Sequence, residues 1–206
     1  MATASQPHPA EFPSERLHRV DVDTYQRMAE AGILTGRDRV VLLDGLLVNI
    51  MTRGDAHVAS TKLTVIALQG VVPRGGHVSK EDPIALIGGP TGLDSVPEPE
   101  VLMIRGGVRD YAKRTPGPSD LASIVEVADR TLKEDRSGLV RYAWAGIPAA
   151  WIVNLPDGVV EVFTQPSGPD PRPGYRSTQA ITPGRSVPVA LDGQEVGAVA
   201  VDGLLP

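Results

Sequence analysis

The run LASIVEVA, residues 121–128, limits the fold more than any other stretch of the chain, because its side chains are almost all apolar or small. Ile124, Val125 and Val127 belong in a buried β-strand, where branched side chains pack well on the pleated surface. Glu126 stands in the middle of this strand. An ionised carboxylate is costly to bury without a proton, a cation or hydrogen-bond donors. The fold must therefore supply one of these partners at Glu126.

Short apolar runs alternate with helix-like segments along the chain, and this order predicts a mixed α/β fold. Asp-Gly at 44–45 and Pro-Asp-Gly at 156–158 each separate two apolar runs, a pattern typical of β-hairpin turns. The helix-like segments end at glycine or proline. The expected elements are a helix over 23–33, hairpin strands within 41–50, a helix over 57–68, a strand over 77–87 interrupted at Pro83, strands over 101–104 and 121–128, a helix over 132–145, hairpin strands over 149–155 and 159–165, and short strands from about residue 174.

The length of 206 residues is typical of one domain. We expect residues 1–15 to be a disordered N-terminal segment and residues 16–206 to form a single domain. The sequence contains no cysteine, which excludes disulfides, thiolate zinc sites and cysteine nucleophiles. The first residues lack the apolar core of a signal peptide, and no run reaches the ~20 apolar residues of a membrane span. We therefore expect a cytoplasmic protein with no membrane partner.

The net charge of −5 argues against tight non-specific DNA binding, because phosphate contacts supply most of that affinity. A local basic segment is present nonetheless. It carries Arg105, Arg109, Lys113 and Arg114, with Asp110 as its one acid. Either this segment holds a DNA backbone, or it is a solvated loop with ordinary surface charges.

Two interpretations of Glu126 are open from the residues alone. In the first, Glu126 forms a structural salt bridge to Arg130, Arg136 or Arg141, or lies at a strand end that water reaches. In the second, Glu126 is a metal ligand or a general base, because such groups have buried and perturbed carboxylates.

A second acidic position strengthens the functional interpretation. The sequence VPEPEVLMI places Glu98 and Glu100 at the start of another apolar strand. If this strand is the neighbour of the Glu126 strand, Glu100 and Glu126 converge on one pocket. Two carboxylates completed by waters suit Mg²⁺ or Mn²⁺. A bound ion of this kind polarises a phosphoryl oxygen and lowers the pKa of a coordinated water.

An ordered set of segments resembles the Uma family of restriction endonucleases, in the PD-(D/E)XK nuclease superfamily. The segments are VLLDGLLV, His57, PEPEVLMI, IVEVAD, a later Asp-Arg, YAWAGIPAAWIVNL, VEVFTQPSGP and the closing DGLLP. The resemblance covers roughly residues 17–206. It implies a restriction-endonuclease-like core with a central mixed sheet flanked by helices. It also implies Mg²⁺ held by carboxylates at strand ends and a lysine that orients or activates water.

Carried over by position, the resemblance makes Glu126 the strand glutamate of the metal site, and Glu100 takes the place of the usual aspartate after proline. Val41 stands where an acid is common, and Leu46 replaces a common glutamate. The family lysine falls on Gly138 or Leu139, and neither residue carries a charge. Lys133, Arg136 or Arg141 are the nearby cations that could substitute, although an arginine is a poor base because it stays protonated.

The leading hypothesis is a Mg²⁺- or Mn²⁺-dependent endonuclease with an incomplete active site. Its metal ligands would be Glu100 and Glu126, and its substitute cation Lys133 or Arg136. The alternative is a catalytically degraded protein of the same fold that acts as a binding or scaffold module. A third possibility is a metal-dependent enzyme for another phosphoester. DNA is the expected partner, through the basic segment described above, and a homodimer is plausible because symmetric pairs are the commonest assembly.

Overall fold

The computed structural model describes residues 16–206 and contains one six-stranded mixed sheet in the order β3-β4-β5-β6-β7-β8. The sequence prediction of a disordered segment over 1–15 lies outside the described residues. Strands β5 and β6 are parallel, and each other neighbouring pair in the sheet is antiparallel. The strands are β3 (Gly76–Lys80), β4 (Val101–Arg105), β5 (Leu121–Ala128), β6 (Ala149–Asn154), β7 (Val159–Pro166) and β8 (Tyr175–Ile181).

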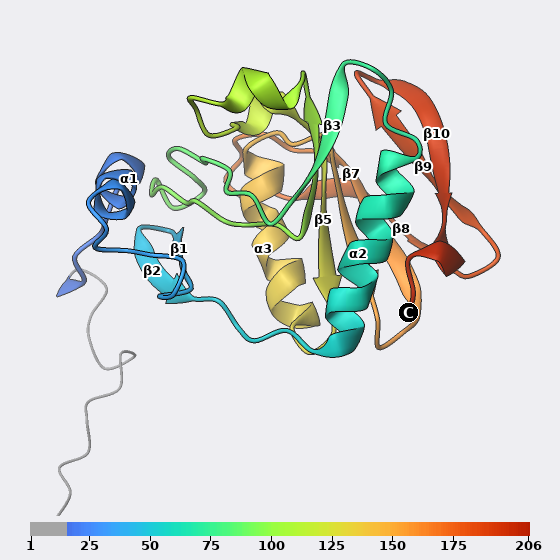
Figure 1. Cartoon of the computed structure of the whole chain (residues 1–206), viewed down its shortest axis with the longest axis horizontal. Helices are drawn as coiled ribbons and strands as arrows, with labels where there is room; N and C mark the ends of the chain where they lie inside the picture. Colours follow the sequence, from blue (N-terminus) through green and yellow to red (C-terminus); the bar gives the residue numbers. More distant parts are fainter. Residues whose placement is uncertain (1–15) are drawn as a thin grey trace, which may run out of the picture.

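Two helices cover opposite faces of this sheet, α2 (Asp55–Gln69) and α3 (Leu132–Trp144). Figure 1 shows the sheet nearly edge-on, with β5 between α3 and α2. Side chains of a strand alternate between faces, so Val125 and Val127 pack with Leu68 of α2, whereas Ile124 packs with Leu139 of α3. Glu126 shares the α3 face with Ile124. None of the helices within residues 16–206 has the length and apolar character needed to span a bilayer.

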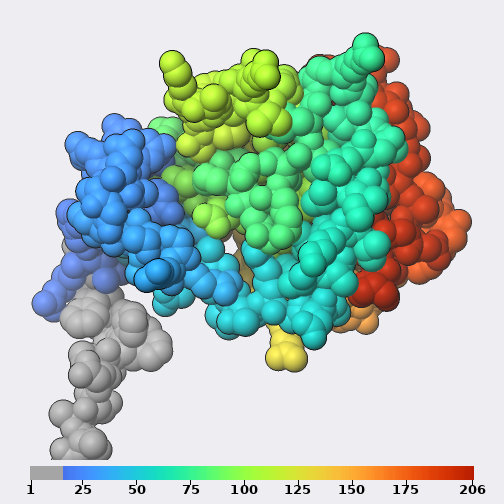
Figure 2. Space-filling model, viewed as in Figure 1, coloured from blue at the N-terminus to red at the C-terminus, as the bar shows by residue number. Residues whose placement is uncertain are grey.

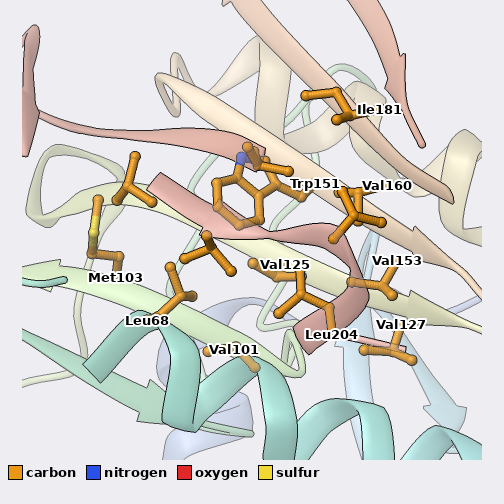
Figure 3. Close-up of a cluster of buried hydrophobic side chains, with 14 of the residues drawn as sticks. Leu68, Val101, Met103, Val125, Val127, Trp151, Val153, Val160, Ile181 and Leu204 are labelled. Atoms are coloured by element: carbon orange, nitrogen blue, oxygen red, sulfur yellow. The ribbon is translucent and has the colours of Figure 1, made fainter. Parts of the chain in front are cut away.

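The larger core lies on the α2 face and is closed by a C-terminal hairpin. Strands β9 (Ser186–Leu191) and β10 (Gln194–Ala200) form this hairpin around the positive-φ turn at Asp192 and Gly193. Trp151 of β6 fills the space between the sheet and the hairpin, beside Val160 (Figure 3). The sequence predicted short strands here, and the structure adds that β8 joins the sheet while β9 and β10 pack over it.

Helix α1 (Val22–Glu30) and the hairpin of β1 (Val40–Leu43) and β2 (Leu46–Asn49) lie to one side of the sheet (Figure 1). Asp44 and Gly45 have φ values of 48° and 74°, as the predicted tight turn requires. Helix α1 begins earlier than predicted because the Asp21 side chain accepts a hydrogen bond from the Thr24 N–H and caps it. It also ends earlier, because Gly32 adopts a left-handed conformation with φ 70°.

The predicted strand over 77–87 is shorter than expected and was wrong beyond Lys80. Glu81 adopts a left-handed backbone conformation with φ 56°, which turns the chain out of the sheet. The following Pro83 lacks a backbone N–H and could not join a ladder of hydrogen bonds. Ile84 and Leu86 are nevertheless fully buried, in irregular chain that packs over the α3 face.

Candidate active site

Glu100 and Glu126 lie opposite each other at one end of the β4–β5 ladder. Val101 of β4 pairs with Val125 of β5 in antiparallel register, and continuing this register by one residue sets Glu100 opposite Glu126. The two carboxyl groups lie close enough for each to shift the pKa of the other. The proximity that the sequence predicted is therefore present in the structure, and the role of the pair as metal ligands stays a prediction.

The pKa values of the two carboxyl groups are shifted in opposite directions. Burial raises the pKa of Glu126 well above its ordinary value, and the adjacent charge of Glu100 raises it further. Burial also acts to raise the pKa of Glu100, but its interactions with Glu126, His57 and Arg53 outweigh it and lower that pKa. These directions favour a proton on Glu126 and a negative charge on Glu100, because ionisation of one of two adjacent carboxyl groups disfavours ionisation of the other.

Tyr142 of α3 fixes the orientation of Glu126. Its hydroxyl donates to Oε1 of Glu126 at 2.8 Å. Glu126 forms no ion pair within residues 16–206, so the salt bridge to Arg130, Arg136 or Arg141 that was the alternative interpretation is not formed. A hydroxyl and a proton therefore supply the partners that its burial demands.

The candidate substitute cations lie in different surroundings. The guanidinium of Arg136 forms two hydrogen bonds to Glu161 of β7, which also accepts from Asn154. Lys133 is exposed in the first turn of α3. Arg141 donates two hydrogen bonds to Asp44 in the β1–β2 turn and so ties the hairpin to α3. The structure brings Glu100 and Glu126 together but does not bring Lys133 or Arg136 into contact with them.

Two side chains that the sequence prediction did not assign to the carboxylate pair, His57 and Arg53, contact Glu100 directly. Nε2 of His57, in the first turn of α2, lies 3.1 Å from Oε1 of Glu100. A guanidinium nitrogen of Arg53, in the loop before α2, lies 3.4 Å from the same oxygen, and another lies 2.8 Å from Glu81. The one sequence signal was the position of His57 at the start of a predicted helix, and no local pattern marked Arg53.

A cavity of about 240 Å³ adjoins the carboxylate pair. It lies under the β1–β2 hairpin, and Figure 2 shows a small opening where the blue hairpin region meets the green and cyan segments. Val41 and Gly138 line it with Glu100 and Glu126. A Cβ atom added at Gly138 would meet no atom within 4 Å outside its own helix backbone. Two positions for which the resemblance implies an acid and a lysine, Val41 and Gly138, therefore lie in the wall of one cavity, and the incompleteness of the site stays a prediction.

A second cavity of about 460 Å³ borders Glu100 from the α2 side and is lined by Arg53, His57 and Asp135. The Asp135 carboxylate of α3 accepts a hydrogen bond from the Thr131 hydroxyl at 2.7 Å. Burial raises the pKa of Asp135 to about 6, and the nearby charge of Glu100 adds to this rise. The negative charge of Glu100 thus disfavours ionisation of Asp135.

Asp135→Asn is expected to stabilise the fold at pH 8 and not at pH 4. The pKa of Asp135 is raised in the folded state from its ordinary 3.8 to about 6. Its favourable contribution is therefore complete below about pH 4 and is lost as the pH rises through 6. The melting temperature should rise by about 2–4 °C at pH 8, the shift that ~1 kcal/mol produces in a domain of this size. Thermal unfolding of both proteins at the two pH values tests this, and an equal difference at both would contradict it.

The donor set fits a divalent ion only in part. Residues 16–206 contain no group of three or more His, Cys, Asp or Glu side chains arranged to hold a metal. The pair Glu100 and Glu126 does offer adjacent carboxylate oxygens, and Mg²⁺ is commonly bound by one or two carboxylates completed by water and substrate phosphates. Coordination by both side chains requires that Glu126 release its proton.

Of the four cationic side chains in the basic segment, two bind acidic residues and two are exposed. Arg105 pairs with Asp192 at 2.5 Å and donates to the Ser119 and Leu121 carbonyls, and Arg114 forms two hydrogen bonds to Asp120. Arg109 and Lys113 are exposed, and no partner is recorded for them within residues 16–206. Their role in DNA binding stays a prediction.

Comparison with known proteins identifies a matching family and a matching fold. The sequence model of the Uma2 family, described as "Putative restriction endonuclease", matches residues 22–199. A crystal structure of a putative nuclease belonging to DUF820 from Anabaena variabilis ATCC 29413 superposes with a TM-score of 0.66 at 13% identity. That match covers 90% of this chain and 97% of the other. No curated protein matches the chain. The α/β fold with a central mixed sheet flanked by helices, predicted from the sequence, is confirmed.

Proposed function

Because the chain belongs to the Uma2 family, described as putative restriction endonucleases, we propose that it hydrolyses phosphodiester bonds of nucleic acid with Mg²⁺ or Mn²⁺. The observation that supports this proposal is the pair Glu100 and Glu126 in adjacent register positions of β4 and β5, beside a cavity. Residues 16–206 are proposed to act as one restriction-endonuclease-like domain.

Glu100 and Glu126 would hold the ion, which when bound would polarise a phosphoryl oxygen and lower the pKa of a coordinated water. His57 and Arg53 keep Glu100 ionised and oriented before an ion arrives. Tyr142 donates to Oε1 of Glu126 and orients that carboxyl group beside Glu100, and Glu126 would have to lose its proton before it could bind an ion. Glu100 could thus bind an ion in its ionised form, whereas Glu126 would first have to lose a proton.

The site is proposed to be catalytically weak. A phosphodiesterase of this kind needs a positioned cation to offset the charge that develops on the phosphate. Gly138 and Val41 leave the cavity without the usual lysine and one usual acid. Arg136 is hydrogen-bonded to Glu161, and Lys133 is exposed. Neither side chain contacts Glu100 or Glu126, so each is a weak candidate for the substitute cation.

Slow cleavage that depends on a divalent ion is the expected outcome with supercoiled plasmid and with single-stranded DNA. Product should form in Mg²⁺ or Mn²⁺ and should be absent in excess EDTA, because the proposed reaction needs a metal ion to lower the pKa of the attacking water. A Glu126→Ala protein should give the EDTA background, whereas Glu30→Ala, at an exposed site on α1, should match the wild type. Cleavage that persists in EDTA, or that survives in Glu126→Ala, would contradict the proposal.

A second candidate function is a binding module of nuclease fold without catalysis. The observation that favours it is the pair of uncharged residues, Val41 and Gly138, in the cavity wall. Arg109 and Lys113 would then provide DNA contacts outside the cavity. Saturable DNA binding by the wild type, with equal background cleavage in wild type and Glu126→Ala, would select this function over the first.

A homodimer is also proposed, on the general frequency of symmetric pairs.

A further inference from the structure

Arg53 is the arginine that reaches the carboxylate pair. Its side chain is 19% exposed, and its two terminal nitrogens point at Glu81 and Glu100. The same side chain lines the cavity that contains Gly138 and the cavity that contains His57. Arg53 therefore stands where both spaces meet Glu100, and a ligand entering either cavity would encounter its guanidinium group.

The backbone around Glu81 holds Arg53 in this position. Glu81 has a left-handed backbone with φ 56°, a conformation that is unfavourable for a residue other than glycine. Its N–H donates to the carbonyl of Glu100 at 3.2 Å, so Glu81 is fixed relative to the carboxylate pair. Its carboxylate then binds Arg53 at 2.8 Å and Lys80 at 3.0 Å. The strained residue is thus the anchor of the arginine.

The contact of Arg53 with Glu100 is loose, and this leaves a donor available. The 3.4 Å separation exceeds the ~2.7–2.9 Å of a strong charge-assisted hydrogen bond. The other arginine on the wall shared with Gly138 is Arg141, which donates to Asp44 in the β1–β2 turn through Nε and one terminal nitrogen. Among the arginines of that cavity wall, Arg53 is therefore the one whose guanidinium group contacts Glu100 itself while one of its terminal nitrogens lacks a short hydrogen bond.

We propose that Arg53 binds the phosphate of the nucleic acid that is to be cleaved, and so supplies from the loop before α2 the positive charge that α3 lacks at Gly138. This inference rests on the proposed nuclease function. The planar guanidinium group offers two parallel donors to phosphate oxygens, which a point charge does not. Since arginine stays protonated, Arg53 binds and neutralises charge and does not accept a proton from water.

The test measures phosphate contact separately from cleavage. Binding of a fluorescent DNA duplex is followed by anisotropy in Ca²⁺, which takes oxygen ligands as Mg²⁺ does, and cleavage is assayed in parallel in Mn²⁺. Each phosphate contact contributes about −0.9 to the slope of log affinity against log salt concentration. Arg53→Met should make this slope shallower by about 0.9. A fourfold rise in salt should thus weaken wild-type binding about 3.5-fold more than binding by Arg53→Met.

Arg74→Met is the matched control, because Arg74 is exposed in the loop between α2 and β3, and its slope should equal that of the wild type. Arg53→Gln keeps hydrogen-bonding capacity and carries the same expectation if Arg53→Met fails to fold. A wild type that binds and cleaves while Arg53→Met keeps the full slope would overturn this inference and leave the nuclease function standing. A wild type that neither binds nor cleaves would overturn the proposed function, and this inference with it.

Discussion

Replacing Gly138 with lysine is expected to raise the rate of Mg²⁺-dependent DNA cleavage by about 10²- to 10³-fold over the wild type, the usual effect of one preorganised electrostatic group. Gly138 lines the cavity beside Glu100 and Glu126, and its Cβ position is open. The first atom of a lysine side chain there would meet no neighbour within 4 Å, and the adjoining cavity offers space for the rest. The helix should also tolerate the change, because glycine within a helix is about 0.8–1.0 kcal/mol less favourable than alanine.

Two control variants separate the ammonium group from other effects of this substitution. Gly138→Ala gives α3 the same relief from glycine without a charge, and Val140→Lys places the same charge at an exposed position of the same helix. Both should cleave at the wild-type rate in a single-turnover assay. A gain in Gly138→Ala as large as that in Gly138→Lys would mean that helix stability, and not the cation, limits the reaction.

Glu126→Gln is expected to reduce cleavage by about 10²- to 10³-fold while leaving the fold intact. Glutamine keeps the shape of the side chain and can still accept from the Tyr142 hydroxyl, but it cannot ionise to bind a cation. Because Glu126 has no cationic partner within residues 16–206, its replacement by glutamine leaves no buried cation unpaired. Loss of such a partner would instead cost about 3–5 kcal/mol.

The stability difference between Glu126→Gln and the wild type should depend on pH. The pKa of Glu126 is raised by burial and by Glu100. The favourable contribution of the protonated side chain is complete below its unfolded-state pKa and is lost as the pH rises through the folded-state value. The variant should thus gain stability relative to the wild type as the pH increases. Thermal melts at pH 5 and pH 9 measure this, and a large loss of stability in the variant at both pH values would point to an unrecognised cationic partner.

Local patterns in the sequence were sufficient to predict many of the strands and two of the hairpins. Asp44-Gly45 and the turn at 156–158 fixed two hairpins, because few residue pairs tolerate the dihedral angles of such turns. The neighbouring placement of the Glu100 and Glu126 strands was also anticipated from two acids set in apolar runs.

Contacts between distant segments were not predictable in the same way. Arg53 and Glu81 are separated by all of α2 and β3, and neither lies in a periodic pattern that would indicate a partner. The hydrogen bonds between Arg136 and Glu161 were not predictable from the sequence either. The spacing of charges on a helix indicates neighbours along the same helix and does not identify a partner on β7. The early end of β3 depends on the backbone of Glu81, whose left-handed conformation is rare for glutamate.

The central claim is that catalysis takes place at the Glu100–Glu126 pair, and the most direct test combines its two variants. Single-turnover cleavage of a labelled duplex in Mg²⁺ is measured for the wild type, Gly138→Lys, Glu126→Gln and the double variant. We expect Gly138→Lys to be fastest, and we expect the double variant to fall to the rate of Glu126→Gln alone, because in this account the added lysine acts only when both Glu100 and Glu126 hold the ion. A double variant that cleaves as fast as Gly138→Lys would show that the reaction does not use Glu126.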